Sequence, residues 1–184
     1  LAFAFFLLQF IDQIHRGIKT HPLAFCGNAG HPNRCGQVRL ASTWSANEHG
    51  VLRAIGEDLD RDGLQETPSR VARMMTELAS ATNLDPADQI TCEFFEESAG
   101  LVLVKDIDFN STCEHHLLPF HGLVHVAYLP RDGRITGLSK LARVVEIASR
   151  RLQVQERLTA QVAQAIEDRL DPLGVFVIIE AEHS

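Results

Sequence analysis

The chain has 184 residues, a formal net charge of -7 and 45% hydrophobic residues, which is an ordinary globular composition. The negative charge excludes a nucleic-acid partner held by bulk electrostatics, so an anionic ligand would need a local basic patch. The cysteines do not form the dense pattern of a disulfide framework, so we expect a reducing, cytoplasmic setting. They are Cys26, Cys35, Cys92 and Cys113.

The first 45 residues read differently from the rest of the chain. Residues 1–11 are almost wholly apolar but too short to span a bilayer, and no membrane partner is expected. They are either the remnant of a signal peptide or a buried helix. Residues 16–45 show no clear periodicity, and we interpret them as loop or poorly ordered. We therefore expect an atypical leader at 1–45, either non-native or disordered, before a domain at 46–184.

Regular patterns begin at Ala46, and the first two of them predict helices. Apolar residues at 51, 52 and 55 predict a short helix that ends near Gly56. Thr67 and Pro68 form a strong helix start, because threonine can cap a helix and proline fits its first turn. The apolar residues of this second helix have helical spacing, and we expect them to face a core. They are Val71, Met74, Met75 and Leu78.

The remaining elements follow in the order strand, strand, helix, helix, strand. Alternating apolar residues predict strands at 101–109 and 122–129, and a third strand is expected at 175–180. Ser139 is predicted to cap the first helix. The inward positions of the two helices are Leu141, Val144, Val145 and Ala148, then Leu158, Val162, Ile166 and Leu170. This order predicts an α+β fold with two helices on one face of a mostly antiparallel sheet, which requires a further strand after residue 184.

The most informative segment is Cys113-Glu114-His115-His116, which follows the first predicted strand. Cys113 and His116 are three residues apart, so on a helical turn their side chains share one face. A thiolate and an imidazole are a zinc-type ligand pair, and a third protein ligand would have to come from elsewhere. The alternative is a small buried cysteine beside an ordinary polar histidine, which is more frequent for such a short pattern.

Several segments in order make residues 46–184 resemble GTP cyclohydrolase type I. They are Gly-Glu-Asp at 56–58, Glu-Thr-Pro-Ser-Arg at 66–70, Cys-Glu-His-His-Leu-Leu-Pro-Phe-His-Gly at 113–122, Gly-Leu-Ser-Lys-Leu-Ala-Arg at 137–143, Gln-Val-Gln-Glu-Arg-Leu-Thr at 153–159 and Glu-Ala-Glu-His at 180–183. The resemblance implies a tunnelling fold whose subunits join their sheets into a barrel and form a homodecamer. It also implies that GTP is opened at C8 with loss of formate, giving dihydroneopterin triphosphate, in active sites between subunits.

The resemblance also assigns roles to single residues near the metal and the purine. Cys113 and His116 match two zinc ligands, so Zn2+ is the expected cofactor. His115 matches the proton-transfer histidine, and His183 matches a second histidine of the active site. Ser139 matches a position near the ribose.

The resemblance assigns the other substrate contacts to charged and amide side chains. Glu156, with Gln155 beside it, matches the guanine-recognising position, where a carboxylate can accept both N–H groups of the pyrimidine edge. The triphosphate-binding positions are matched by Arg70, Lys140 and Arg143. Glu114 and His121 are candidates for orienting or structural roles.

One departure from the family pattern concerns the third zinc ligand. In the family it is a cysteine two residues after the histidine that matches His183, and the printed sequence ends at Ser184. From this we expect weak zinc binding, an unpaired strand edge and loss of activity. The alternative function is therefore a truncated, inactive homologue that associates with full-length subunits.

Two sister enzymes, pyruvoyl-tetrahydropterin synthase and the deazaguanine nitrile reductase, are disfavoured by the Cys-Glu-His-His and Gly-Leu-Ser-Lys segments. The sequence does not distinguish a folate from a biopterin pathway.

Overall fold

The computed structural model of the chain describes residues 23–28, 50–97 and 100–183. The chain divides into two compact units, residues 1–29 with 79–184 and residues 30–78, and each unit is described by itself. None of the helices in the described ranges is long and apolar enough to cross a membrane.

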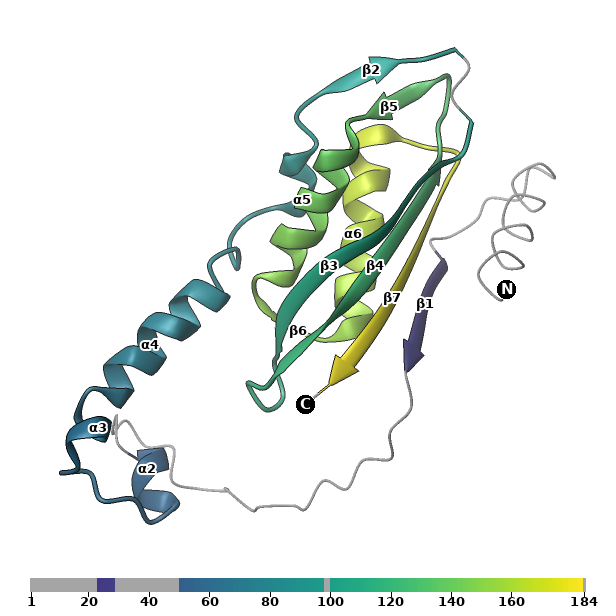
Figure 1. Cartoon of the computed structure of the whole chain (residues 1–184). Coiled ribbons are helices and arrows are strands. Elements are labelled where there is room, and N and C mark those ends of the chain that lie inside the picture. Colours follow the sequence, from purple (N-terminus) through teal and green to yellow (C-terminus); the bar gives the residue numbers. More distant parts are fainter. Residues whose placement is uncertain (1–22, 29–49, 98–99, 184) are drawn as a thin grey trace. The chain divides into compact units, whose positions relative to one another are not determined.

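The larger unit is built on a five-stranded sheet in the order β1-β7-β4-β3-β6 (Figure 1). Its long strands are β3 (Val102–Cys113), β4 (Pro119–Leu129) and β7 (Gly174–His183). Strand β4 lies in the middle and pairs antiparallel with both long neighbours. All three predicted strands are therefore present, and each is longer than its apolar pattern indicated.

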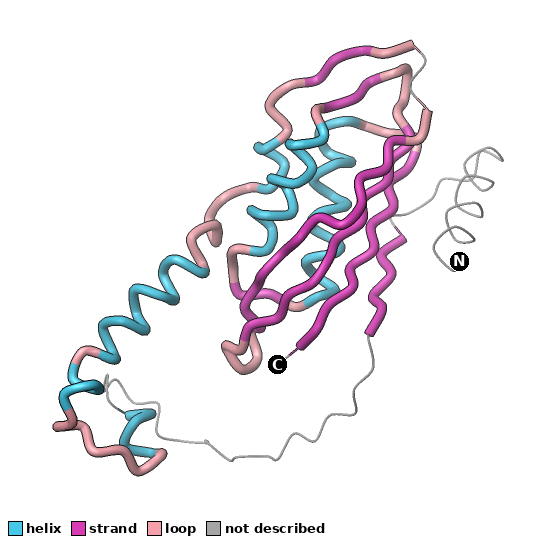
Figure 2. Tube along the Cα trace, viewed as in Figure 1, coloured by secondary structure: helices cyan, strands magenta, loops and turns pink. Residues whose placement is uncertain are grey.

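Helices α5 (Leu138–Ser149) and α6 (Gln155–Leu170) cover one face of this sheet (Figure 2). The apolar spacing of each helix is 3.6-periodic, which gives each one a stripe that can be buried against the strands. The fully buried residues include Leu141, Val144, Leu158, Val162 and Ile166, all 0% exposed. A short 3-10 helix, η1 (Pro86–Gln89), packs against both helices. The predicted α+β fold is confirmed.

Three short strands were not expected from the sequence. Strands β2 (Glu93–Phe95) and β5 (Arg134–Thr136) form a separate antiparallel pair, and β6 (Leu152–Gln153) runs parallel to the end of β3.

The hydroxyl of the fully buried Tyr128 accepts a hydrogen bond from the Thr136 N–H at 3.2 Å. Because this phenol is buried, its pKa is raised above the ordinary value. The contact attaches the segment that precedes α5 to the core.

The predicted capping role of Ser139 is wrong. Helix α5 begins at Leu138 with Gly137 as its extended N-cap, and no side chain caps it. Ser139 therefore lies inside the first turn, where its hydroxyl is not in the capping position. The first turn is closed by the backbone, since the Lys140 N–H donates to the Gly137 carbonyl at 2.8 Å.

Strand β1 (Leu23–Asn28) differs from the loop interpretation of residues 16–45. It pairs in parallel with β7, from Leu23 opposite Phe176 to Asn28 opposite Ala181. The loop interpretation is wrong for these six residues, and the rest of the leader lies outside the described ranges. The pairing also occupies the β7 edge that the sequence led us to expect unpaired.

A close approach of β4 and β7 depends on one glycine. Gly122 lies opposite Ala181, and a Cβ atom at position 122 would come within 1.9 Å of the Glu180 carbonyl oxygen. A side chain of any size would force the two backbones apart. Gly122 therefore helps to set the position of the β7 end, which carries His183.

The smaller unit contains α2 (Gly50–Ala54), α3 (Asp62–Gln65) and α4 (Thr67–Leu78). The predicted helix start at Thr67 is confirmed, but the Thr67 hydroxyl donates to the Gly63 carbonyl at 3.3 Å. The predicted core is wrong within this unit, because α4 buries no residue and Met74 is 49% exposed. Periodicity shows that the helix has an apolar face, while three short helices offer too little surface to enclose it.

Candidate active site

The site begins at the turn between β3 and β4. Strand β3 ends at Cys113, and the Leu117 N–H donates to the Cys113 carbonyl at 2.9 Å, which closes a single helical turn. Leu117 has a φ of 59°, the left-handed conformation that commonly ends such a turn. The Cys113 Sγ lies 3.9 Å from His115 Nδ1, and the rings of His115 and His116 are 6.3 Å apart. The turn thus presents a sulfur and two imidazoles together.

This turn is attached to the start of α6 by a charged pair and by the backbone. The Arg157 guanidinium donates to both Glu114 carboxylate oxygens, at 2.5 and 2.9 Å. Hydrogen bonding from Arg157 lowers the pKa of Glu114 below its ordinary value. The Glu114 N–H also donates to the Gln153 carbonyl at 3.0 Å. These contacts fix the turn relative to the helix that carries Gln155 and Glu156.

His183, at the end of β7, reaches the same region from the neighbouring strand. Its ring stacks on Phe120 with a centroid distance of 4.9 Å and an interplanar angle of 3°. Phe120 in turn makes an edge contact with Phe109 in the core, at 5.7 Å. The His183 Nε2 lies 3.0 Å from Oε1 of Gln155, a side chain that is only 3% exposed. His183 is therefore held from two sides.

Glu156 lies in the first turn of α6 and is exposed. A carboxylate there is favoured by the helix dipole, and no partner for it is found among the described residues. The structure therefore brings Glu156 to the same end of the sheet as the Cys113 turn and His183. Gln155 points the other way, into the core, instead of lying beside Glu156 on the surface.

The predicted phosphate-binding residues of the larger unit lie at the other end of the sheet. The Ser111 hydroxyl donates to the Ser149 carbonyl at 2.7 Å, so the last turn of α5 lies beside the Cys113 end of β3. Ser139 is ten residues earlier on α5, which places it about 15 Å away along the helix axis. Lys140 and Arg143 share one face near that start, and neither has an ion-pair partner among the described residues.

Arg70 belongs to the smaller unit and is described separately from the others. It lies on α4, is exposed, and has no side-chain partner among the residues the structure describes. Its predicted role stays a prediction.

Two side chains of the site are metal ligands of a suitable kind. Cys113 and His116 supply sulfur and nitrogen, which zinc prefers, from one helical turn. Cys113 is half-buried and free of any disulfide. The described residues contain no group of three His, Cys, Asp or Glu side chains arranged to hold a metal ion.

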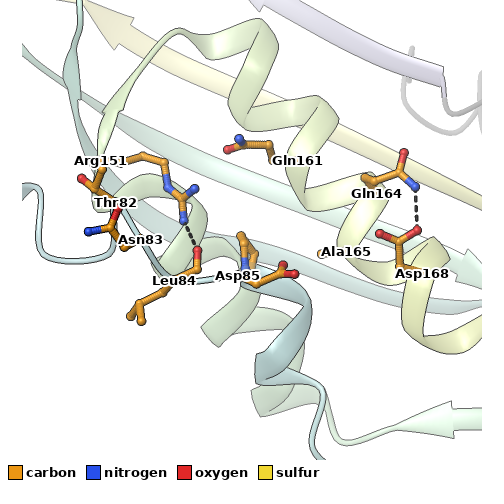
Figure 3. A pocket seen from close by; sticks show the side chains of 10 residues that line it. Thr82, Asn83, Leu84, Asp85, Arg151, Gln161, Gln164, Ala165 and Asp168 are labelled. Atoms are coloured by element: carbon orange, nitrogen blue, oxygen red, sulfur yellow. Dashed lines mark hydrogen bonds between the residues drawn. The ribbon is translucent and has the colours of Figure 1, made fainter.

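A cavity of about 400 Å³ lies elsewhere, between residues 82–86 and α6 (Figure 3). Leu84, Asp85, Arg151, Gln161 and Asp168 are among its lining residues. The Arg151 guanidinium donates to the Leu84 carbonyl at 2.8 Å and so belongs to the wall of the cavity. None of the predicted site residues lines it, and we do not assign the chemistry to it.

Comparison with known proteins agrees with the motifs around this site. The family model described as GTP cyclohydrolase I matches residues 45–184. A protein named GTP cyclohydrolase 1 from Streptococcus agalactiae serotype Ia is 63% identical over 132 residues, which cover 72% of this chain and 71% of the relative. The chain belongs to the GTP cyclohydrolase I family. GTP cyclohydrolase 1 from Streptococcus mutans serotype c is 61% identical over 133 residues, 72% of this chain and 69% of the relative.

Two residues of this GTP cyclohydrolase I chain gain structural roles that the sequence reasoning did not assign. Arg157 holds the Cys113 turn through Glu114, and Phe120 supports the His183 ring. Arg157 lies in segment 153–159 and Phe120 in segment 113–122, both of which match the family. This match was the one indication in the sequence that the two residues matter for the site. Their partners are 43 and 63 positions away in the sequence, so pairing them required the fold.

Proposed function

We propose that the chain is a GTP cyclohydrolase I that opens the imidazole ring of GTP by hydrolysis and releases formate. The product is 7,8-dihydroneopterin triphosphate, and the reaction is the first step of a folate or pterin pathway, in the cytoplasm. The observation that carries the proposal is the meeting of the Cys113 turn, His183 and Glu156 at one end of the sheet, in a chain of this family.

The exposed side chains at this end have the chemistry that the reaction requires. The Glu156 carboxylate can accept two N–H groups of guanine, a paired contact that adenine does not offer. His115 and His183 carry imidazole rings, the side chain that most often serves in proton transfer. At the other end of the sheet, Lys140 and Arg143 would bind the triphosphate and Ser139 would lie near the ribose, with Arg70 as a further phosphate contact.

Zinc is the proposed cofactor, with Cys113 and His116 as its ligands in this chain. When bound, it would activate a water molecule for attack on C8. Strand β7 runs antiparallel to β4 with His183 opposite Phe120. An extended continuation would bring the second residue after His183 level with Leu118, whose carbonyl accepts the Cys113 N–H at 2.8 Å. A third ligand at that position would therefore arrive beside Cys113.

The zinc proposal is tested by adding one residue after Ser184. An added cysteine should increase zinc content after gel filtration to about one ion per chain, and an added serine should not. Equal and tight zinc binding by the unmodified chain would show that other residues complete the ligand set.

We also propose that the active form is a homo-oligomer, a decamer as in the family. The start of α5, which carries the proposed phosphate contacts, lies about 15 Å along the helix axis from the last turn of α5, which is beside the Cys113 end of β3. Two copies that join their sheets could bring one end of each together. A shared site would explain why neither end is enclosed within the larger unit.

A complementation experiment tests the function and the shared site together. At GTP concentrations well below KM, Glu156→Gln and Lys140→Ala should each lower formate release to about a tenth or less when expressed alone. Co-expression of the two variants should restore about one quarter of the sites, because random assembly pairs two unaltered halves at that frequency. The absence of any recovery would contradict the shared site. No formate release by the unaltered chain would instead support the inactive-homologue alternative.

A further inference from the structure

The orientation of the Gln155 carboxamide is determined by its two partners. Its Nε2 donates to the Ile179 carbonyl at 3.0 Å, and a backbone carbonyl can only accept. The flipped amide would place two oxygen acceptors against each other at this buried position. The amide oxygen Oε1 must therefore face His183.

The same argument determines which nitrogen of His183 carries a hydrogen. The Gln155 Oε1 can only accept, so His183 Nε2, 3.0 Å away, must be the donor. In a neutral imidazole this leaves Nδ1 unprotonated, with its lone pair available. No partner for Nδ1 is found among the described residues, and His183 as a whole is exposed.

We propose that Gln155 is a positioning residue that holds His183 as the Nε2–H tautomer and leaves Nδ1 as the nitrogen that faces the ligand. This changes the role expected for Gln155, which was predicted to contact the substrate. The buried amide acts on His183, because a 180° flip of the ring would keep the stacking on Phe120 but would replace Nε2 by a carbon and so lose the contact with Gln155.

This tautomer has a direct chemical consequence. Neutral His183 can take a proton from an O–H or N–H group of the ligand or of water, but it has no proton to give from Nδ1. The transfer leaves the conjugate base on the ligand and an imidazolium on His183, which still donates to Gln155 through Nε2. The return of that proton completes the cycle, so His183 begins each turnover as an acceptor. This last step rests on the proposed function, whereas the tautomer does not.

The tautomer is measured directly by solid-state NMR on the full chain with ¹⁵N-labelled histidine. The spectra are recorded over a range of alkaline pH, and the signals of the neutral ring are compared. The His183 signals are identified by their loss in His183→Asn. We expect a protonated Nε2 and an unprotonated Nδ1. A protonated Nδ1 in the unaltered chain would overturn the proposal without any variant or any assay of activity.

A matched pair of variants separates positioning from general structural effects. Gln155→Met keeps the volume but removes both hydrogen bonds, so His183 should populate both tautomers. Gln164→Met makes the same chemical change on the exposed side of α6 and should leave the His183 signals unchanged. An unchanged His183 tautomer in Gln155→Met would overturn the proposal.

Turnover kinetics then distinguish positioning from substrate binding. Loss of a group that orients a catalytic histidine should lower kcat on the order of tenfold with little change in KM. A rise in KM with kcat unchanged would restore the original substrate-contact role of Gln155 and overturn this one. If no variant and no unaltered chain turns over GTP, the proposed function fails while the NMR result still decides the tautomer.

Discussion

The two ends of the sheet differ in how their functional side chains are held. At the Cys113 end, the turn is tied to α6 by Arg157, and His183 is fixed by Gln155 and Phe120. At the start of α5, Lys140 and Arg143 project without ion-pair partners among the described residues, and only the backbone before them is anchored, through Tyr128.

This difference matches the demands of the two tasks that we propose for these ends, proton transfer and triphosphate binding. Proton transfer is sensitive to small changes in the distance between donor and acceptor. A side chain that is already fixed in position loses little entropy on reaching the transition state. A triphosphate is recognised mainly by charge, which acts over longer distances and tolerates mobile lysine and arginine side chains. At the Cys113 end the side chains themselves are held by partners, whereas at the start of α5 only the backbone before Lys140 is anchored.

The largest expected effect comes from closing the space beside Gly122. Gly122→Ala should reduce the free energy of unfolding by about 1–3 kcal/mol, because its Cβ would overlap the Glu180 carbonyl and push β7 away. It should also lower activity through displacement of His183. Chemical denaturation measures the first effect. Gly100→Ala is the control, since its Cβ would meet nothing within 4 Å. Equal stability of the two variants would show that β7 is not positioned by this contact.

A change at the purine end should affect the reaction more than the fold. Glu156→Gln removes the charge of the proposed guanine contact and should cost on the order of 2 kcal/mol of transition-state binding. The thermal midpoint should hardly change, because Glu156 is exposed and without a described partner. Formate release and thermal melting are measured side by side. Unchanged turnover would remove Glu156 from the site.

A change at the proposed phosphate-binding end should alter GTP binding in a way that depends on salt concentration. Lys140→Ala should weaken GTP binding about tenfold, close to 1.4 kcal/mol, and the difference should shrink as salt is added. Lys105→Ala, an exposed lysine on β3, is the matched control and should bind GTP normally. If the loss for Lys140→Ala does not depend on salt, this end is more rigidly built than we infer.

The smallest expected effect comes from Tyr128, whose hydrogen bond to Thr136 attaches the segment before α5 to the core. Tyr128→Phe deletes the hydrogen bond to Thr136 and should cost about 1 kcal/mol of stability at neutral pH. Burial raises the pKa of Tyr128 in the folded state. The neutral phenol therefore contributes fully to the free energy of unfolding below the ordinary tyrosine pKa of about 10, and this contribution is lost as pH rises through the pKa of the folded state. Stability should therefore fall more steeply in alkali for the unaltered chain than for Tyr128→Phe. An equal loss of stability with rising pH in the unaltered chain and in Tyr128→Phe would contradict this account.

The sequence predicted the parts of the fold that have long periodic patterns. The strands β3, β4 and β7 and the helices α5 and α6 repeat their apolar residues over several turns or pleats. Strands β2, β5 and β6 have two or three residues each, too few to show a period. Ser139 was placed as a cap because serine favours that position, but Gly137, already extended, serves as the N-cap.

The site was predicted as a set of residues without its internal contacts. Motif matches pointed to Cys113, His115, Glu156 and His183, and the structure gathers these at one end of the sheet. The direction of the Gln155 amide depends on the Ile179 carbonyl on another strand, and no pattern in the sequence specifies such a contact. The separation of Lys140 from Cys113 likewise follows from the course of α5.

Phe120 contacts both the core and a residue of the proposed site. One edge of its ring belongs to the core, against Phe109, and one face supports His183. A substitution at this position changes stability and chemistry together, so selection for one property is constrained by the other. Evolution can adjust Lys140 or Glu156 almost independently of folding, but it can change Phe120 only along with compensating substitutions on both sides of the ring.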